Sequence, residues 1–516
     1  MTRRAAAALA AIAVALLSPA AAQAARGQQT MMEDSTQLLT LGQGPRDFAL
    51  DQFKALGTDI VKVRVEWRDF APDASSRRKP DFDATDPGAY PSGAWDALDA
   101  AVRGIVSRGM KPFLMVGPPA PDWATAAASK KYVGVWKSDP AEYGKFVTAI
   151  GRRYSGVNEG LPRVSMWSVW NEPNHPQFIQ PLSERIGGKM VPTAADQYRR
   201  LYVAATDAFK VTGHGSDTLL FGEVLPIGQR KLGTLNTISP LLWLREFFCL
   251  DSKYRPFKGS AARARGCSPY PKIVTSGFAM HPYTKPVGPR YHLPNPDDAT
   301  IGQIPRVTAA LDRIAKTHRI RKGLPIYSTE FGIQTDPPDC VGFGAPITRQ
   351  AAIINEAEYD SYLAPRVKTY SQYLLIDDPI LTQFDPGSNE RYGRFQTGLL
   401  WGQNAVRCES PGVQFKYATP KQPTFNAFQT PIYVRALSHN RGVQVLGRAR
   451  PRGHASQSIS ILHNGRRVAS VTAAGYFLKS VRRASSGKWQ LRWTFNGVTY
   501  SSRVASALPD PPVSAR

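Results

Sequence analysis

Hydrophobic positions along the chain repeat with two different periods, which alternate from one stretch to the next. Residues 59–67, "DIVKVRVEW", alternate apolar and polar positions, which is typical of a strand. Residues 48–56, "FALDQFKAL", and 95–109, "WDALDAAVRGIVSRG", place apolar residues three and four apart, which is typical of a helix. The chain is therefore expected to alternate short strands with amphipathic helices.

The same alternation continues over about 400 residues. Further strands are expected at 111–117, 163–173, 218–224, 274–283, 324–332 and 370–378, and further helices at 139–154, 193–211, 306–318 and 349–363. Counting one more strand near residues 34–42, "DSTQLLTLG", gives eight. Eight βα units joined by right-handed crossovers predict an α/β fold, a (β/α)8 TIM barrel over residues 30–434. A doubly wound sheet is the alternative, but no G-x-G-x-x-G follows the first strand.

The pattern changes near residue 435, where helical spacing gives way to short strands. Asn464-Gly465 and Asn496-Gly497 are two-residue hairpin signals between such strands. Residues 435–516 are therefore expected to form a small all-β, sandwich-like accessory domain.

The first residues have the composition of an export signal. Arg3 and Arg4 precede the apolar run 5–17, and Ala22-Gln23-Ala24 is a small-x-small cleavage site. The alternative, a membrane anchor, is disfavoured because the run is short of the ~20 residues that a span needs. We expect residues 1–24 to be a signal peptide cleaved near Ala24, a secreted protein, and no membrane span afterwards.

The chain has four cysteines, an even number that favours two disulfides in an exported protein. Three connectivities are open. The nearest pairing is Cys249 with Cys267, which would leave Cys340 with Cys408. Their spacing does not match a zinc site, so none is expected. No other metal and no cofactor is expected either.

Positive charge is concentrated at the C-terminal end. The formal charge is +25, or +23 without Arg3 and Arg4, and residues 435–516 contribute 14 Lys and Arg against one acid, Asp510. Such a field favours anionic partners: acidic glycans, cell-wall polymers or phospholipid headgroups. The alternative is a generic basic surface. No nucleic-acid recognition motif accompanies the charge, so nucleic acid is not an expected partner.

Two glutamates stand at the ends of predicted strands. Glu172 lies in "WNEP" (170–173) and Glu330 in "STEFG" (328–332), about three βα units apart. The carboxyl ends of barrel strands share one mouth, where strands four and seven face each other. A pair of facing carboxylates is what glycosidic bond cleavage needs, one as proton donor and one as anion.

With "HPY" at 281–283, these motifs resemble the clan-A (β/α)8 retaining glycoside hydrolases, including the cellulase-like family five and the xylosidase-like family thirty-nine. The resemblance covers residues 30–434. It implies that Glu172 is the acid/base and Glu330 the nucleophile of a retaining glycosidase acting on a poly- or oligosaccharide.

The resemblance also implies roles for four supporting residues. Asn171 would hydrogen-bond the sugar 2-hydroxyl, and His281 would line the same subsite. Tyr283 would donate to the nucleophile, and Arg64 would add positive charge beneath it; both would favour its ionised form.

Tryptophan rings can stack on sugars, and Trp67, Trp123 and Trp401 are candidates for that role. Two other functions share these motifs. One is a catalytically inactive carbohydrate-binding barrel, and the other is a transglycosylase with the same site.

Overall fold

The computed structural model describes Ala25 and residues 27–509, apart from 128–131, 159, 340, 342–343, 386, 403–415 and 453–454. Within this part of the chain, eight parallel strands form one sheet in the order β12-β1-β2-β3-β4-β7-β8-β9. They are β1 (Gln29–Glu33), β2 (Ile60–Glu66), β3 (Lys111–Gly117), β4 (Met166–Val169), β7 (Thr218–Val224), β8 (Gly277–Met280), β9 (Ile326–Ser328) and β12 (Thr369–Tyr373). A parallel bridge from Ile326 to Val367 joins the two ends of the sheet, so the predicted (β/α)8 barrel is confirmed.

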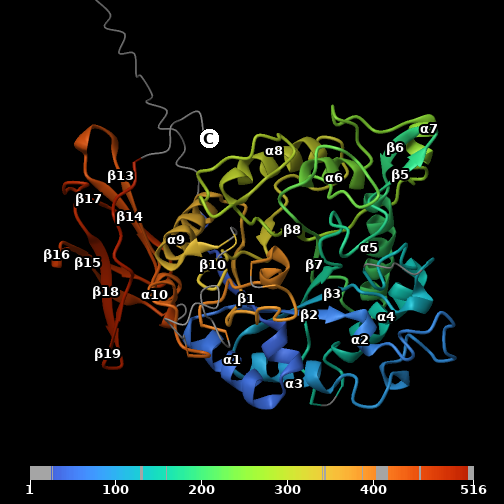
Figure 1. Cartoon of the computed structure of the whole chain (residues 1–516), viewed down its shortest axis with the longest axis horizontal. Helices are drawn as coiled ribbons and strands as arrows, with labels where there is room; N and C mark the ends of the chain where they lie inside the picture. Colours follow the sequence, from blue (N-terminus) through green and yellow to red (C-terminus); the bar gives the residue numbers. More distant parts are fainter. Residues whose placement is uncertain are drawn as a thin grey trace, which may run out of the picture.

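Helices surround this sheet, as the alternating pattern predicts (Figure 1). They are α1 (Gln43–Ala55), α2 (Trp67–Phe70), α3 (Asp96–Ser107), α4 (Pro140–Arg153), α5 (Ala194–Val211), α6 (Pro240–Phe247), α7 (Gly259–Arg263), α8 (Ile304–Ala315), α9 (Ile347–Leu363) and α10 (Thr424–Gln429). The loops add two short strand pairs, β5 (Ser183–Ile186) with β6 (Lys189–Pro192) and β10 (Thr335–Asp336) with β11 (Ala345–Pro346). None of the helices in the described part of the chain is long and apolar enough to cross a membrane.

The first barrel strand is not where the sequence places it. Residues 36–40 form a helical turn, and β1 runs just before them. The expectation near residues 34–42 is therefore wrong. The sequence signal fails because β1 is short and carries an acid, Glu33, that faces Lys62 inside the barrel. Side chains of one interior layer, including Met31, Ile60 and Phe113, fill the barrel below this level.

The C-terminal strands form two antiparallel sheets (Figure 1). One contains β13 (Ile432–Ala436), β14 (Val443–Gly447) and β17 (Phe477–Val481). The other contains β15 (Gln457–His463), β16 (Arg466–Ala473), β18 (Trp489–Phe495) and β19 (Val498–Ser501). A shared apolar core that includes Val445, Ile461 and Leu491 lies between them, which makes the accessory part a β-sandwich.

Cys249 and Cys267 form a disulfide, the nearest of the pairings considered. Cys340 and Cys408 lie outside the described residues, as does the expected signal peptide.

Candidate active site

The carboxyl end of β4 turns sharply and places Glu172 at the mouth of the barrel. Trp170 and Glu172 both have positive φ, 64° and 36°, and Glu223 at the end of β7 has φ 55°. Each such residue costs about 1–3 kcal/mol, a strain that concentrates at functional sites. The Glu172 backbone N–H donates to the Glu223 carbonyl over 3.0 Å, which fixes the turn against the neighbouring strand.

Glu172 and Glu330 meet across this mouth. One oxygen of each carboxylate and one ring nitrogen of His281 all lie within 4.8 Å of one another. Retaining glycosidases hold their two carboxyl groups about 5–5.5 Å apart, whereas inverting enzymes need about 6.5–9.5 Å to admit a water. The two nearest oxygens are therefore closer together than the carboxyl groups of an inverting enzyme.

His281 lies between the carboxylates rather than along a sugar subsite. Its side chain is fully buried. Nδ1 is 2.8 Å from Glu172 Oε1 and 3.3 Å from Glu330 Oε2, and Nε2 is 2.6 Å from Glu223 Oε2. The expected role in lining the subsite is thus corrected, because an imidazole ringed by three acids is best placed as a bridge between them.

The acids also keep this imidazole protonated. Burial alone would lower the pKa of His281, but the charge of Glu330 and hydrogen bonds to Glu172 and Glu223 outweigh it and raise the pKa to about 10. As an imidazolium, His281 donates from both nitrogens.

A lysine that sequence reasoning missed lies beneath the site. The ammonium of Lys62 on β2 is fully buried, 2.7 Å from Glu330 Oε1 and 3.1 Å from Glu223 Oε2. Arg64 pairs with Glu66, and its charge also acts on Glu330 as expected, but among the described residues it is Lys62 that hydrogen-bonds to Glu330. Positions 62 and 64 face the same way on a strand, and Lys62 is the deeper of the two. A lysine inside the apolar run "IVKVRV" was the available signal.

Glu330 is held as an anion by its neighbours. Burial would raise its pKa, but the charges of His281 and Lys62 outweigh burial and lower it. The Tyr283 hydroxyl donates to Glu330 Oε2 over 2.9 Å, the contact that the resemblance implies. An ionised, oriented carboxylate at this position has the chemistry of a nucleophile.

Asn171 is almost fully buried beside Glu172, and its Oδ1 has no hydrogen-bond partner within the described part of the chain. A buried acceptor without a partner is costly unless a ligand supplies the donor. Its position next to Glu172 suits a sugar hydroxyl.

Two of the three candidate tryptophans are core residues. Trp67 is buried and stacks on Phe146 at 5.9 Å, and Trp401 is buried under the Lys421 ammonium, 4.9 Å from its ring. Neither ring offers a face to a sugar, because each fills space behind the strand ends. Trp123 is half-buried, with its indole N–H donating to Pro72 O.

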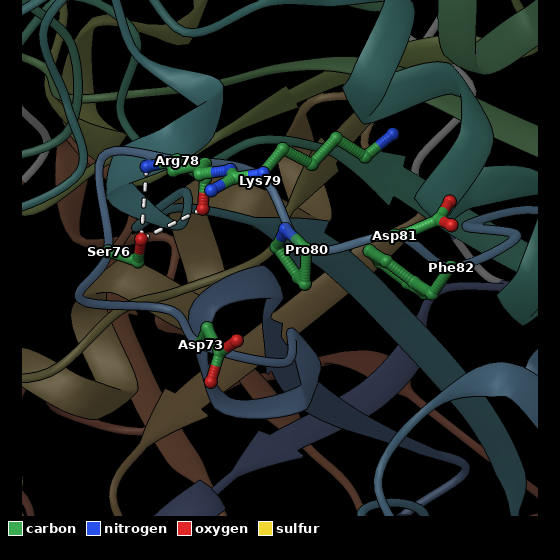
Figure 2. A pocket seen from close by; sticks show the side chains of 7 residues that line it. All are labelled: Asp73, Ser76, Arg78, Lys79, Pro80, Asp81 and Phe82. Carbon is green, nitrogen blue, oxygen red and sulfur yellow. Dashed lines mark hydrogen bonds between the residues drawn. The ribbon is translucent and has the colours of Figure 1, made fainter.

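Two cavities lie in the loops around Trp123. The first, of about 490 Å³, lies in the loop after α2, and its lining includes Asp73, Lys79 and Phe82 (Figure 2). Trp123 itself lines the second, of about 270 Å³. Neither catalytic candidate lines either cavity. Two residues that line the first cavity contact a predicted site residue: the Lys79 ammonium is 5.6 Å from the Trp123 ring, and the Phe82 ring packs against it at 6.0 Å.

Glu172, His281 and Glu330 could each offer one ligand atom to a metal ion. A ligating histidine must be neutral, however, and His281 is held protonated. Both oxygens of Glu330 already accept hydrogen bonds, from Lys62 and Tyr283. The charges therefore favour a hydrogen-bonded network over a metal centre.

The histidines near Glu172 give a test of this electrostatic account. We expect both ring nitrogens of His281 to stay protonated from pH 5 to 8 in ¹⁵N NMR spectra. His175, whose pKa burial lowers, should be neutral at pH 7 in the same spectra. Because the folded pKa of His281 is raised, its stabilising contribution is complete below about 6.5 and is lost as the pH rises to about 10. A neutral His281 at pH 7 would contradict the account.

Glu223 and Glu33 are buried acids that both contact the Lys62 ammonium, and replacing each of them with glutamine should change the stability of the fold by different amounts. The charge of Lys62 and the His281 hydrogen bond overcome burial and lower the pKa of Glu223 to about 2, whereas burial raises that of Glu33 to about 8. At pH 7, Glu223→Gln removes a charge and should destabilise the fold by about 3–5 kcal/mol. Glu33→Gln replaces a neutral carboxyl and should lower the melting temperature far less. Equal shifts in the two variants would show that the assigned charges are wrong.

Comparison with known proteins finds similar folds at low sequence identity. A glucosidase from Croceicoccus marinus is 13% identical, with a TM-score of 0.48 over 93% of this chain and 97% of that one. A family 39 glycoside hydrolase from Bacteroides cellulosilyticus WH2 is 13% identical, with a TM-score of 0.45 over 87% and 78%. A family 1 β-glucosidase from Thermotoga maritima is 12% identical, with a TM-score of 0.43 over 71% and 85%.

No protein-family model matches the chain, and no curated protein matches it. A functional assignment therefore has to come from the chain's own side chains.

Proposed function

We propose that this protein is a secreted retaining glycoside hydrolase that cleaves O-glycosidic bonds of a poly- or oligosaccharide. The observation that carries the proposal is the approach of Glu172 and Glu330 to within 4.8 Å at the barrel mouth. Secretion is supported by the expected signal peptide at residues 1–24.

In the first step, the Glu330 carboxylate attacks the anomeric carbon while Glu172 protonates the leaving oxygen. The aglycone departs as an alcohol, and the sugar is bound to Glu330 as an ester. Asn171 Oδ1 accepts a hydrogen bond from a sugar hydroxyl, which offsets the cost of its burial without a partner.

In the second step, Glu172 takes a proton from water, and the hydroxide oxygen attacks the anomeric carbon. The Glu330 ester breaks and the carboxylate is restored, so one water is consumed in each cycle. The charges of Lys62 and His281 favour Glu330 as a leaving anion by the same means that keep it ionised at rest.

His281 acts through the glutamates. Its Nδ1 proton points at Glu172 Oε1 over 2.8 Å, so it stabilises Glu172 whenever that group is an anion. That is the state Glu172 reaches after giving up its proton. Glu223, anionic and fully buried, holds the other end of the ring.

A screen of plant, fungal and bacterial wall polysaccharides, read by product masses, tests the activity. Separate Glu172→Gln and Glu330→Gln variants should lose the activity found. Asp207→Asn, an exposed acid on the outer helix α5, is the control and should keep it. Wild-type turnover in both glutamate variants would refute the proposal.

The two alternatives give different results in the same screen. A carbohydrate-binding barrel would retain a glycan without releasing product. A transglycosylase would transfer the sugar to an added acceptor in preference to water. Nothing in the site favours either over hydrolysis, since both glutamates are present and close.

A further inference from the structure

Some cations of the accessory domain contact the barrel, whereas others face solvent. Four of them bond to the barrel. Arg450 pairs with Glu358, and Arg448 donates to Thr30 over 2.9 Å. Arg503 donates to Asn355 over 2.8 Å, and Arg435 donates to the Tyr359 hydroxyl. These arginines fasten the sandwich to the barrel, so the charge of the domain cannot be assigned as a whole to an external partner.

The barrel covers only one of the two sheets. Tyr433, Leu446 and Leu478, one from each strand of the β13-β14-β17 sheet, pack against α9, where the Tyr359 and Tyr433 rings stack at 4.2 Å. Trp493 on β18 donates to Thr430 from the inner side of the second sheet, and among the described residues no hydrogen bond or ion pair joins the outer face of the β16-β15-β18-β19 sheet to the barrel. In Figure 1, β16 lies on the far side of the sandwich from the barrel.

Strand register shows which side chains share that outer face. Ile461 and Leu491 pair across β15 and β18 and point into the sandwich core. Their neighbours therefore point outward. Arg492 pairs with Ser460 on one side and Ser501 on the other, and Arg467 pairs with Leu462 two residues further along β15.

Two more cations extend the charge at one end of this sheet. Arg466 follows the Asn464-Gly465 turn, and the Lys488 backbone N–H donates to Asn464 Oδ1 over 2.9 Å, which holds it against the same turn. We call Arg466, Arg467, Lys488 and Arg492 the outer-sheet cations. All four are exposed.

Within the described part of their domain no acid faces the outer-sheet cations, because residues 436–509 contain no Asp or Glu. Their side chains make no ion pair or hydrogen bond to any described residue. Between them the face carries hydroxyls, among them Ser470, Thr472, Thr494 and Thr499. The result is a flat hydroxyl-bearing surface with unneutralised positive charge.

We propose that this outer sheet binds an acidic polysaccharide and so holds the enzyme on a carboxylate-bearing glycan. Guanidinium groups pair with carboxylates through two parallel hydrogen bonds, and serine and threonine hydroxyls can bond sugar hydroxyls. The choice of a glycan rather than another polyanion rests on the proposed function.

The surface suits a membrane or a single-stranded nucleic acid less well. Interfacial membrane binding needs apolar side chains that insert, and the exposed large apolar residues of the described accessory domain are only Val498 and Val504. Binding of single strands relies on exposed aromatic platforms. The tryptophans of this sheet, Trp489 and Trp493, are buried in the sandwich core.

The test compares two full-length variants with equal charge loss. One carries Arg466→Gln, Arg467→Gln, Lys488→Gln and Arg492→Gln. The control carries Lys111→Gln, Lys189→Gln, Lys210→Gln and Lys322→Gln, four exposed barrel lysines without ion pairs among the described residues. Binding to polygalacturonate is measured at about 50 mM salt, where screening is weak. Pullulan serves as the neutral polymer, and vesicles with anionic phospholipid as the rival polyanion.

We expect the outer-sheet variant to bind polygalacturonate at least about tenfold more weakly than wild type, and the control to change less than about twofold. Wild-type binding should be lost near 0.5 M salt, where the screening length is only a few ångströms. An equal loss of affinity in both variants would show that binding depends only on net charge, and it would overturn the inference. So would absence of wild-type binding, or preference for the vesicles. Because binding is measured without turnover, this test of the outer sheet can fail or succeed independently of the proposed hydrolysis.

Discussion

Glu330→Gln is expected to reduce glycoside hydrolysis by at least about 10⁴-fold, because the variant has no anion to attack the anomeric carbon. The substitution is nearly isosteric, but it also removes a charge 2.7 Å from Lys62 and 3.3 Å from His281. The melting temperature must therefore be measured beside the rate, so that lost chemistry is separated from lost folding.

Chemical rescue by azide distinguishes lost chemistry from lost folding, because only a folded variant can be rescued. In Glu330→Gly, azide should enter the vacated space and attack the anomeric carbon directly. The product should be a glycosyl azide of inverted configuration, formed from a substrate with a good leaving group. A Glu330→Gly variant that folds, binds substrate and gains nothing from azide would contradict the nucleophile assignment.

Glu172→Gln is expected to lower hydrolysis by about 10²–10⁴-fold, the usual contribution of a general acid or base. The loss should depend on the leaving group. Formation of the glycosyl-enzyme should suffer strongly with an alkyl glycoside, which needs a proton on departure, and little with a dinitrophenyl glycoside, which does not.

This dependence distinguishes Glu172 from Glu330, since loss of the nucleophile affects every leaving group. With Glu172→Gly, azide should enter the vacated space, intercept the glycosyl-enzyme and give a product of retained configuration. Equal losses for alkyl and dinitrophenyl glycosides would show that Glu172 is not the proton donor.

Much of the barrel was predictable from the spacing of apolar residues. Burial of a strand or helix makes apolar residues recur along the sequence with the period of that element. The exception, β1, shows the limit of this signal. Its interior face includes Glu33, whose presence depends on Lys62 from the next strand. A buried pair of ionisable side chains inside a barrel breaks the apolar pattern on which strand prediction depends.

The two glutamates were predictable because motif and strand end coincide at both. The network behind them was not. Lys62 and Glu223 come from β2 and β7, and only the closed barrel brings them to His281 and Glu330. Sequence position shows neither how deep a side chain lies nor which neighbour it meets. For the same reason, sequence reasoning identified the charge of Arg64 near Glu330 but missed Lys62, which contacts it.

Two of the candidate tryptophans show the opposite error, in which sequence reasoning assigned a site role to residues that the structure places in the core. Trp67 directly follows β2, and Trp401 lies well beyond the last barrel strand; both were candidates for stacking on a sugar, yet both are buried. A large aromatic side chain at such a position satisfies packing and stacking equally well in sequence terms. Only the exposed area of the ring in the structure distinguishes a core residue from one that can stack on a sugar.

The central claim is that Glu172 and Glu330 carry out a double displacement. The most direct test is the anomeric configuration of the first product, followed by ¹H NMR during hydrolysis of a responsive substrate and before mutarotation. One oxygen of each carboxylate lies within 4.8 Å of the other, closer than the about 6.5–9.5 Å that inverting enzymes use, so the product should have the configuration of the substrate. A first product of inverted configuration would contradict the account.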